Sequence, residues 1–400
     1  MNEKYPVFKR GVKIIPQPNC CLVYSWQQQM FDVFNFESLI FFNEINGVVS
    51  TQQIIDRVAA NYPKIPMKAI ESDLLKLQEC LTQKGYLTTS AIPINNSAIF
   101  EFADRISEVK IVQADVEITK NCNLRCKYCF NESGKDSPEL PLNQWIELLD
   151  SLYDKGLRVI KVSGGEPFLY TSILELLEYV QKKFIVSINT SGYFIDEEIA
   201  HRLSTMNLQI VQVSLDSITA KAHDLLRGKG TWEKAIRAIE LLRHMNVPVR
   251  ISTTVTTQNY DELGDIRNLA DAYGVELLLE ALKEVGKATN MEPSYFVTNP
   301  EKVKQYSDES FVHKILDELE MTCQSQLGIV GISHKGNIKP CNLTEEHFAR
   351  HNADVVMKFE KNWRYSNSPI LANANSASDK VISLLKDGTI KSKDKCIFEY

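Results

Sequence analysis

From about residue 109 to about residue 290, short apolar runs alternate with helical patterns, and this alternation restricts the fold more than any other feature. The apolar runs have the length and composition of buried strands, and they are expected at 114–119, 159–163, 185–189, 210–214, 249–255 and 275–279. Helices are expected between them, at 142–153, 171–181, 196–205, 232–244 and 261–273. Such alternation predicts an α/β fold in which helices wrap a parallel sheet and ligands bind at the carboxyl ends of the strands.

Three cysteines follow the first predicted strand, in the segment Thr119-Lys-Asn-Cys122-Asn-Leu-Arg-Cys126-Lys-Tyr128-Cys129-Phe130. Their C-x3-C-x2-C spacing places three thiolates on one short loop. Three thiolates can each bind one iron of a cubane and leave the fourth iron open, whereas electron-carrying clusters usually have four cysteine ligands. A structural zinc site needs a fourth ligand, and none lies nearby, because His201 is the first histidine of the chain. The spacing therefore favours an iron–sulfur cluster with an open site.

This cysteine loop, with the aromatic Tyr128 before its last cysteine, resembles that of the radical S-adenosylmethionine (SAM) enzymes. A second match, Gly164-Gly165-Glu166-Pro167, follows the next predicted strand and resembles the motif with which the family binds the methionine amino group of SAM. A Gly-Gly turn alone is weak evidence, but its place one strand–helix unit after the cysteines makes the pair specific. The resemblance covers about residues 109–288. It implies a partial (β/α)6 barrel, similar to a TIM barrel, with SAM and a [4Fe-4S] cluster held by Cys122, Cys126 and Cys129.

Further candidate SAM ligands stand at predicted strand ends. Asn189 ends the third strand, where a polar side chain and a flexible turn can meet the ribose, and Ser214 ends the fourth. Arg227 stands where the family often places an arginine near the SAM carboxylate. Ordinary turn chemistry or surface charge explains each of these three residues equally well. The expected cofactor-binding residues are thus Tyr128, Gly164, Gly165, Glu166, Pro167, Asn189, Ser214 and Arg227.

Residues 1–90 are expected to form a separate winged-helix domain. Strand-like runs at 11–15, 20–24 and 30–34 precede helices at about 37–45, 51–60 and 66–83. This block resembles the peptide-recognition elements of enzymes that mature ribosomally made peptides. In that family a leader peptide adds as an extra strand to the edge of the small sheet, so the resemblance implies a precursor peptide as partner.

A DNA-binding winged helix is the alternative for this domain. Against it, the last predicted helix mixes two lysines with three acidic residues and has no basic face: Lys68, Glu71, Asp73, Lys76 and Glu79. The net charge of −6 and a pI of about 5.8 also disfavour a protein that neutralises phosphates. No apolar run of about 18 residues and no signal peptide are present. We therefore expect a cytoplasmic protein without nucleic-acid or membrane partners.

A connector at 91–108 and a small C-terminal domain at 291–400 are expected on either side of the 109–290 core. Nine cysteines, an odd number, indicate metal sites or free thiols rather than disulfides. In the C-terminal part, Cys323-x12-Gly336-x4-Cys341 resembles the opening of SPASM/Twitch auxiliary-cluster domains. The fuller pattern has several more cysteines and here only Cys396 follows, so one auxiliary cluster with an unidentified or absent fourth ligand is expected, and a shortened chain stays open.

Two other uses of these late cysteines stay open. Cys323 and Cys341 with His347 and His351 would make a Cys2His2 zinc site, although the seventeen-residue gap between the cysteines is unlike a zinc finger. Alternatively, one thiol is free and donates a hydrogen atom to a carbon radical.

The resemblances together imply an enzyme that forms a 5′-deoxyadenosyl radical from SAM, with electrons from a donor protein, and modifies a precursor peptide. No Ser-His-Asp order or paired-carboxylate motif competes with this reading, and no catalytic residue is assigned beyond the cluster. Side-chain crosslinking, through a carbon–carbon, ether or thioether bond, is favoured because an auxiliary cluster can accept the electrons it releases. Peptidyl epimerisation with a cysteine as hydrogen donor is the alternative, and a non-catalytic peptide-binding protein with a structural metal is the more remote one.

Overall fold

The computed structural model of the chain describes residues 4–16, 20–35, 37–96, 98–100, 111–134, 138–154, 156–283, 285–297, 301–307, 329–339 and 349–350. These residues divide into two compact units. The first unit contains the described residues up to 100, and the second contains those from 111 onwards. Within the described ranges, none of the helices combines the length and hydropathy needed to cross a lipid bilayer.

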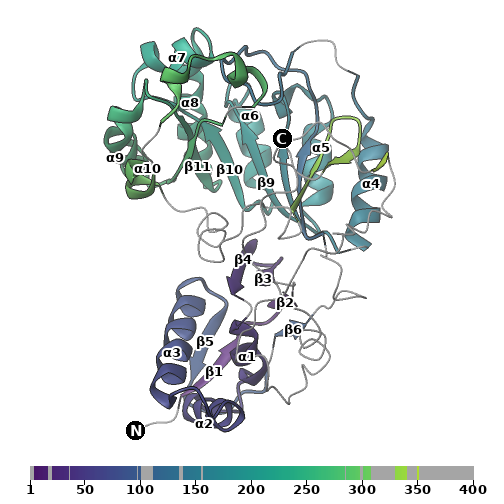
Figure 1. The fold of residues 1–400 in the computed structure, drawn as a ribbon. Helices are drawn as coiled ribbons and strands as arrows, with labels where there is room; N and C mark the ends of the chain where they lie inside the picture. Colours follow the sequence, from purple (N-terminus) through teal and green to yellow (C-terminus); the bar gives the residue numbers. More distant parts are fainter. Residues whose placement is uncertain are drawn as a thin grey trace. The chain divides into compact units, whose positions relative to one another are not determined.

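The first unit contains two small sheets and three helices (Figure 1). Its strands are β1 (Tyr5–Phe8), β2 (Lys13–Pro16), β3 (Cys20–Ser25), β4 (Met30–Asn35), β5 (Leu87–Ser90) and β6 (Ile99–Phe100). The larger sheet has the order β4-β3-β2-β6, and β1 pairs with β5 in the smaller one. The helices are α1 (Ser38–Glu44), α2 (Thr51–Asn61) and α3 (Met67–Gln83). The three strands and three helices expected from the sequence are therefore present, and β1, β5 and β6 are additional.

Local sequence signals account for the helix boundaries in this unit. The Ser50 side chain accepts a hydrogen bond from the Gln53 N–H, and the Gln53 side chain accepts one from the Ser50 N–H, so α2 begins with a complete capping box. Helix α3 begins directly after Pro66. Its residues Ile70 and Leu74 are buried in the core of the unit, which explains their helical spacing.

The second unit is built on a nine-stranded sheet of order β12-β11-β10-β9-β8-β7-β13-β14-β15. Its six consecutive parallel strands are β7 (Gln113–Glu117), β8 (Val159–Ser163), β9 (Ile185–Thr190), β10 (Ile210–Ser214), β11 (Val249–Val255) and β12 (Glu276–Ala281). The helices between them are α4 (Leu142–Asp154), α5 (Ile173–Val180), α6 (Glu197–Ser204), α7 (Ala220–Arg227), α8 (Thr231–His244) and α9 (Leu263–Tyr273). All expected strands and helices are found within a few residues, and α7 was not expected.

One face of this sheet is apolar and the other is polar. In β11, Val249, Ile251, Thr253 and Val255 are buried, whereas the residues between them are partly exposed. Polar side chains alternate with apolar ones in the neighbouring strands as well, at Ser187, Asn189, Gln212 and Ser214. Because the strands are parallel and consecutive, all their carboxyl ends lie at one edge, where the loops carrying the predicted site begin.

The strands after residue 328 belong to the same sheet. Strand β13 (Ile329–Ile332) pairs in parallel with β7, β14 (Asn337–Lys339) pairs antiparallel with β13, and β15 (Ala349–Arg350) follows. A short helix, α10 (Glu301–Tyr306), precedes them. Although residues 291–400 are expected to form a separate domain, β13, β14 and β15 extend the core sheet. The predicted auxiliary ligands Cys323, Cys341 and Cys396, and the alternative ligands His347 and His351, lie outside the described residues.

Candidate functional site

The cysteine loop leaves the carboxyl end of β7 and is hydrogen-bonded to the loop after β8. The Gly165 N–H donates to the Thr119 carbonyl at 2.7 Å, and the Glu166 N–H donates to the Asn121 carbonyl at 2.8 Å. Cys122 is buried, and Cys126 and Cys129 are partly exposed; all three are free thiols. The structure thus brings the two sequence motifs into direct backbone contact.

Only glycine permits this contact. A Cβ atom on Gly165 would lie 2.1 Å from the Asn121 carbonyl oxygen, and one on Gly164 would lie 2.4 Å from the Thr119 oxygen. Gly164 also has φ of +142°, a conformation that residues with a side chain rarely adopt. The two glycines therefore let the loop after β8 pack against the cysteine loop without a gap.

Glu166 connects this contact to the end of the third strand. Its buried carboxylate accepts hydrogen bonds from the Thr190 hydroxyl at 2.7 Å and from the Ser191 hydroxyl and N–H at 2.6 and 2.9 Å. Burial raises the pKa of Glu166, and these hydrogen bonds oppose the rise. Pro167 is buried and begins a short 3₁₀ helix, so its place is explained by backbone geometry. The Glu166 carboxylate thus connects the loop after β8 to the end of β9. Contact of the Gly164–Pro167 motif with SAM stays a prediction.

Asn189, near the end of β9, has an unsatisfied polar atom. Its side-chain oxygen is buried and has no hydrogen-bond partner among the described residues. A buried acceptor without a partner is rare and costly in a folded protein, and a bound ligand is one way to satisfy it. Ser214, predicted beside it, ends β10 and is partly exposed. Both residues therefore stand at the edge where a ligand would bind.

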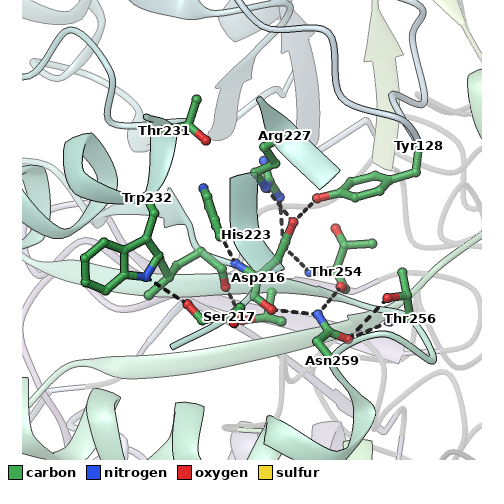
Figure 2. A network of polar contacts seen from close by, with 12 residues as sticks. Tyr128, Asp216, Ser217, His223, Arg227, Thr231, Trp232, Thr254, Thr256 and Asn259 are labelled. Atoms are coloured by element: carbon green, nitrogen blue, oxygen red, sulfur yellow. Dashed lines mark hydrogen bonds and ion pairs between the residues drawn. The ribbon is translucent and has the colours of Figure 1, made fainter. Parts of the chain in front are cut away.

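Tyr128, Asp216 and Arg227 form a buried network beside the cysteines (Figure 2). Arg227, the last residue of α7, donates from Nε to Asp216 Oδ2 at 2.7 Å and from Nη2 to Oδ1 at 3.1 Å. The Tyr128 hydroxyl donates to the same carboxylate, and the guanidinium carbon lies 5.4 Å from the centre of the Tyr128 ring. Two donors of Arg227 are thus engaged by Asp216, and a contact to the SAM carboxylate would use the others.

The charges in this network stabilise each other. Burial acts to raise the pKa of Asp216, but the charge and hydrogen bonds of Arg227 outweigh it and hold that pKa below its ordinary value. Burial acts to lower the pKa of Arg227, and Asp216 and Tyr128 reverse this effect, so the guanidinium stays charged. The pair is a bidentate, charge-assisted interaction, the strongest class of hydrogen bond in proteins.

A second layer of side chains holds the backbone at Asp216. His223 Nδ1 accepts a hydrogen bond from the Asp216 N–H at 3.1 Å, and the Asn259 amide donates to the Asp216 carbonyl at 2.8 Å. Burial lowers the pKa of His223 to about 4, so it is neutral and acts as an acceptor. Sequence reasoning missed His223 and Asn259. Only their places shortly after the fourth and fifth strands could have indicated them.

Three cysteine thiols stand on one loop, and in a cubane each thiolate binds a different iron, so these residues could hold a cluster with one open iron. Among the residues that the structure describes, no three Cys, His, Asp or Glu side chains form a site for a single metal ion. Burial raises the pKa of the Cys122 thiol to about 12, and a bound metal would reverse this because it deprotonates a coordinating thiol.

Backbone N–H groups are already directed at two of these sulfur atoms. The Leu124 N–H donates to Cys122 Sγ and the Ser133 N–H to Cys129 Sγ, both at 3.4 Å. Such donors stabilise a thiolate. Together with the glycine contact and the unsatisfied Asn189 oxygen, they make these residues fit a cluster with a small molecule beside it.

Comparison with known proteins agrees with this geometry. Residues 116–271 match the model of the radical SAM superfamily, and this part of the chain is a radical SAM domain. The chain is 34% identical to the mycofactocin maturase MftC of Mycobacterium ulcerans over 193 residues, which is 48% of this chain and 52% of MftC. It is 27% identical to the subtilosin biosynthesis protein AlbA of Bacillus subtilis over 256 residues, covering 60% of this chain and 57% of AlbA. The chain spans about half the length of these relatives.

The fold is shared with a solved structure. Streptococcus suis SuiB bound to S-adenosylmethionine superposes with a TM-score of 0.57 at 15% identity, covering 95% of this chain and 94% of SuiB. The predicted α/β class, with a TIM-like core of parallel strands and outer helices, is confirmed.

Proposed function

We propose that this chain is a radical SAM enzyme that modifies a ribosomally synthesised precursor peptide by crosslinking its side chains. The observation that carries this proposal is the direct contact between the cysteine loop and the Gly164–Pro167 turn at the carboxyl edge of the sheet. The names of related proteins support the class of substrate. MftC is a mycofactocin maturase, SkfB is a sporulation killing factor maturation protein, and SuiB has a structure bound to the precursor peptide SuiA.

In this proposal Cys122, Cys126 and Cys129 hold a [4Fe-4S] cluster with an open iron. The backbone of Gly164 and Gly165 borders the methionine end of SAM. When bound, the cluster and SAM would supply 5′-deoxyadenosyl radical chemistry, which can act on carbons that no acid–base pair can activate. The Asn189 oxygen and Ser214 orient the nucleoside.

An apolar cluster at the cysteine loop excludes water from this side of the site. Tyr128, Leu226 and Ala288 are buried together, and four partly buried side chains pack on them: Leu282, Met291, Tyr295 and Phe296. A reactive carbon radical is protected from side reactions by such exclusion of water.

The first unit offers an edge for a leader peptide. In the β4-β3-β2-β6 sheet, the short strand β6 pairs in parallel with β2 and covers that edge. Among the described residues no strand pairs with the outer side of β4. We therefore assign leader binding to β4, by addition of a strand through main-chain hydrogen bonds. Holding the leader raises the effective concentration of the attached core peptide towards the mM range.

The auxiliary cluster at Cys323, Cys341 and Cys396, and an electron-donor protein, belong to the same proposal. A second cluster would accept the electrons that crosslinking removes from the peptide. An enzyme without it fits the epimerase alternative, which is redox-neutral.

The test is anaerobic reconstitution with iron and sulfide, followed by dithionite, SAM and synthetic peptides encoded by short reading frames beside the gene. Formation of 5′-deoxyadenosine, about eight irons per chain and a product lighter by two hydrogen atoms are expected. About four irons and a product of unchanged mass would instead establish the epimerase. Cys126→Ala should abolish 5′-deoxyadenosine formation, whereas Cys80→Ala, a core substitution in the first unit, should not. Absence of 5′-deoxyadenosine with every peptide would support a binding protein.

A further inference from the structure

We propose that Asp216 and Arg227 are positioning residues that balance charge beside the Cys126 thiolate and thereby hold the reduction potential of the cluster low. The inference rests on the cluster assigned above to Cys122, Cys126 and Cys129. It concerns the electrostatics of the cluster loop and is independent of which peptide the enzyme modifies.

Backbone contacts bring Arg227 to the cysteine loop. The Lys127 N–H, between Cys126 and Tyr128, donates to the Leu226 carbonyl at 3.0 Å. Leu226 and Arg227 are the last two residues of α7, so the end of this helix is attached to the loop. The Tyr128 hydroxyl adds a second link, through the Asp216 carboxylate. The arginine and its carboxylate are therefore held in a defined place beside Lys127 and Tyr128, the two residues that follow Cys126.

An unbalanced charge on either residue of this pair would interact strongly with neighbouring groups, because both side chains are buried. The Asp216 side chain is 0% exposed and the Arg227 side chain is 11% exposed, so water screens neither. Both groups contact Tyr128 of the cysteine loop, whose hydroxyl donates to Asp216 and whose ring centre lies 5.4 Å from the Arg227 guanidinium carbon, so one negative and one positive charge stand beside the same segment. The two charges thus act on this segment in opposite senses.

This balance gives the two residues opposite effects on reduction. Reducing a cluster adds one negative charge, which a nearby positive charge favours and a nearby negative charge opposes. With Asp216 intact, the positive charge of Arg227 is neutralised and the cluster stays hard to reduce, which keeps it a strong reductant. Removing the carboxylate alone leaves a buried guanidinium uncompensated beside the thiolate.

The measurement is the midpoint potential of the reconstituted full-length protein, obtained by redox titration with EPR detection, without SAM or peptide. For Asp216→Asn, the ratio of reduced to oxidised cluster at a fixed potential should rise about tenfold, a shift of 59 mV for a one-electron couple. For Arg227→Gln the ratio should fall by a similar factor. The double variant should return towards the wild-type potential.

Two controls separate charge from structure. Arg227→Lys keeps the positive charge but loses the bidentate geometry, and its potential should stay near that of wild type. Glu276→Gln removes one charge of the exposed Arg250–Glu276 pair at the amino-terminal ends of β11 and β12 and should leave the potential unchanged.

Shifts of the same sign in Asp216→Asn and Arg227→Gln, or equal potentials for Arg227→Lys and Arg227→Gln, would overturn the inference while leaving the proposed function intact. A variant that fails to fold is recognised by its iron content, and the sign of the shift in the other of Asp216→Asn and Arg227→Gln then still tests the inference. If wild type itself binds no cluster, the proposed function fails, and this inference fails with it.

Discussion

The polar side chains of the site differ in how completely their atoms are bonded. Asp216 is fully buried, yet its two oxygens accept hydrogen bonds from Arg227, Tyr128 and the Thr254 N–H. Asn189, by contrast, keeps a buried oxygen without a partner among the described residues. A polar side chain with all its hydrogen bonds made within the protein stabilises the fold by itself. A buried polar atom without a hydrogen-bond partner is best explained by a ligand that bonds to it. The two kinds of residue should therefore respond differently to substitution.

Asn189→Ala should weaken SAM binding without destabilising the fold. The variant removes a buried acceptor that contributes no hydrogen bond in the free protein, so thermal stability should be unchanged or slightly higher. Loss of one hydrogen bond to the nucleoside should raise the Kd for SAM about tenfold. Calorimetric titration and thermal unfolding of the same sample check both parts. Ser187→Ala, two residues earlier in β9, is the control, and equal Kd values for the two variants would contradict the assignment.

Gly165→Ala should displace the cysteine loop. The new methyl group would lie 2.1 Å from a backbone oxygen and 2.6 Å from the carbon of the same carbonyl, and neither can rotate away. We expect a loss of about 3 kcal/mol in the free energy of unfolding and a lower iron content after reconstitution. Gly134→Ala is a matched control, because Gly134 is hydrogen-bonded to the same loop and has no atom within 4 Å of the added Cβ. Similar iron contents in the two variants would refute this role for Gly165.

His223 should make stability depend on pH. Its pKa is about 4 in the folded protein and about 6.5 when unfolded, so the unfolded state binds more protons between these values. The contribution of neutral His223 to the free energy of unfolding is therefore complete above pH 6.5 and is lost as the pH falls towards 4. His223→Asn keeps an acceptor for the Asp216 N–H but does not titrate. In urea unfolding, the free energy of unfolding of wild type should fall by about 2 kcal/mol more than that of His223→Asn between neutral pH and about pH 5. If wild type and His223→Asn lost the same free energy of unfolding over this pH range, His223 would not be the source of the pH dependence.

Among the elements, the added strands β13 and β14 depend on a buried ion pair. Lys339, at the end of β14, donates to Glu117, the last residue of β7, at 3.1 Å, and both side chains are nearly inaccessible. Strand β13 lies between them in the sheet and is buried along its whole length. The pair therefore joins the C-terminal strands to the strand that carries the cysteine loop.

Lys339→Met should lower the free energy of unfolding by about 3 kcal/mol, because it leaves the Glu117 carboxylate buried without its cation. Adding Glu117→Leu should recover most of the loss, since two apolar side chains replace the pair. Arg250→Met, which breaks an exposed ion pair in the same sheet, should cost less than about 1 kcal/mol. Urea unfolding of the variants checks this, and a double variant no more stable than Lys339→Met would contradict the interpretation.

At the scale of the whole molecule, two units divide the proposed work. In the proposed function the second unit would hold the cluster and SAM, and the first would hold the leader at β4. Leader binding would then concentrate the substrate and take no part in the chemistry.

A core peptide without its leader should be modified with a kcat/KM about 100-fold lower than the full precursor, because tethering no longer raises its local concentration. Supplying the core at mM concentration should restore much of the rate. Product formation by mass spectrometry measures this, and 5′-deoxyadenosine formed without any peptide serves as the reference. Equal kcat/KM for both peptides would exclude a delivery role for the first unit.

The sequence by itself determined the local elements and the motifs. The alternation of strands and helices between β7 and β12, the helices α1 to α3 and the spacing of the three cysteines all depend on residues close together in the chain. Periodicity and turn chemistry act over such short distances, so these features were predictable.

Only the tertiary structure decided which distant residues meet. Lys339 and Glu117 are 222 residues apart in sequence, and Tyr128 and Asp216 are 88 apart. Strand β6 pairs with β2 across more than eighty residues, and Arg227, expected near SAM, faces a carboxylate that the sequence did not connect to it. Such contacts depend on strand order and on the burial of complementary charges when the whole chain packs. No local pattern encodes them.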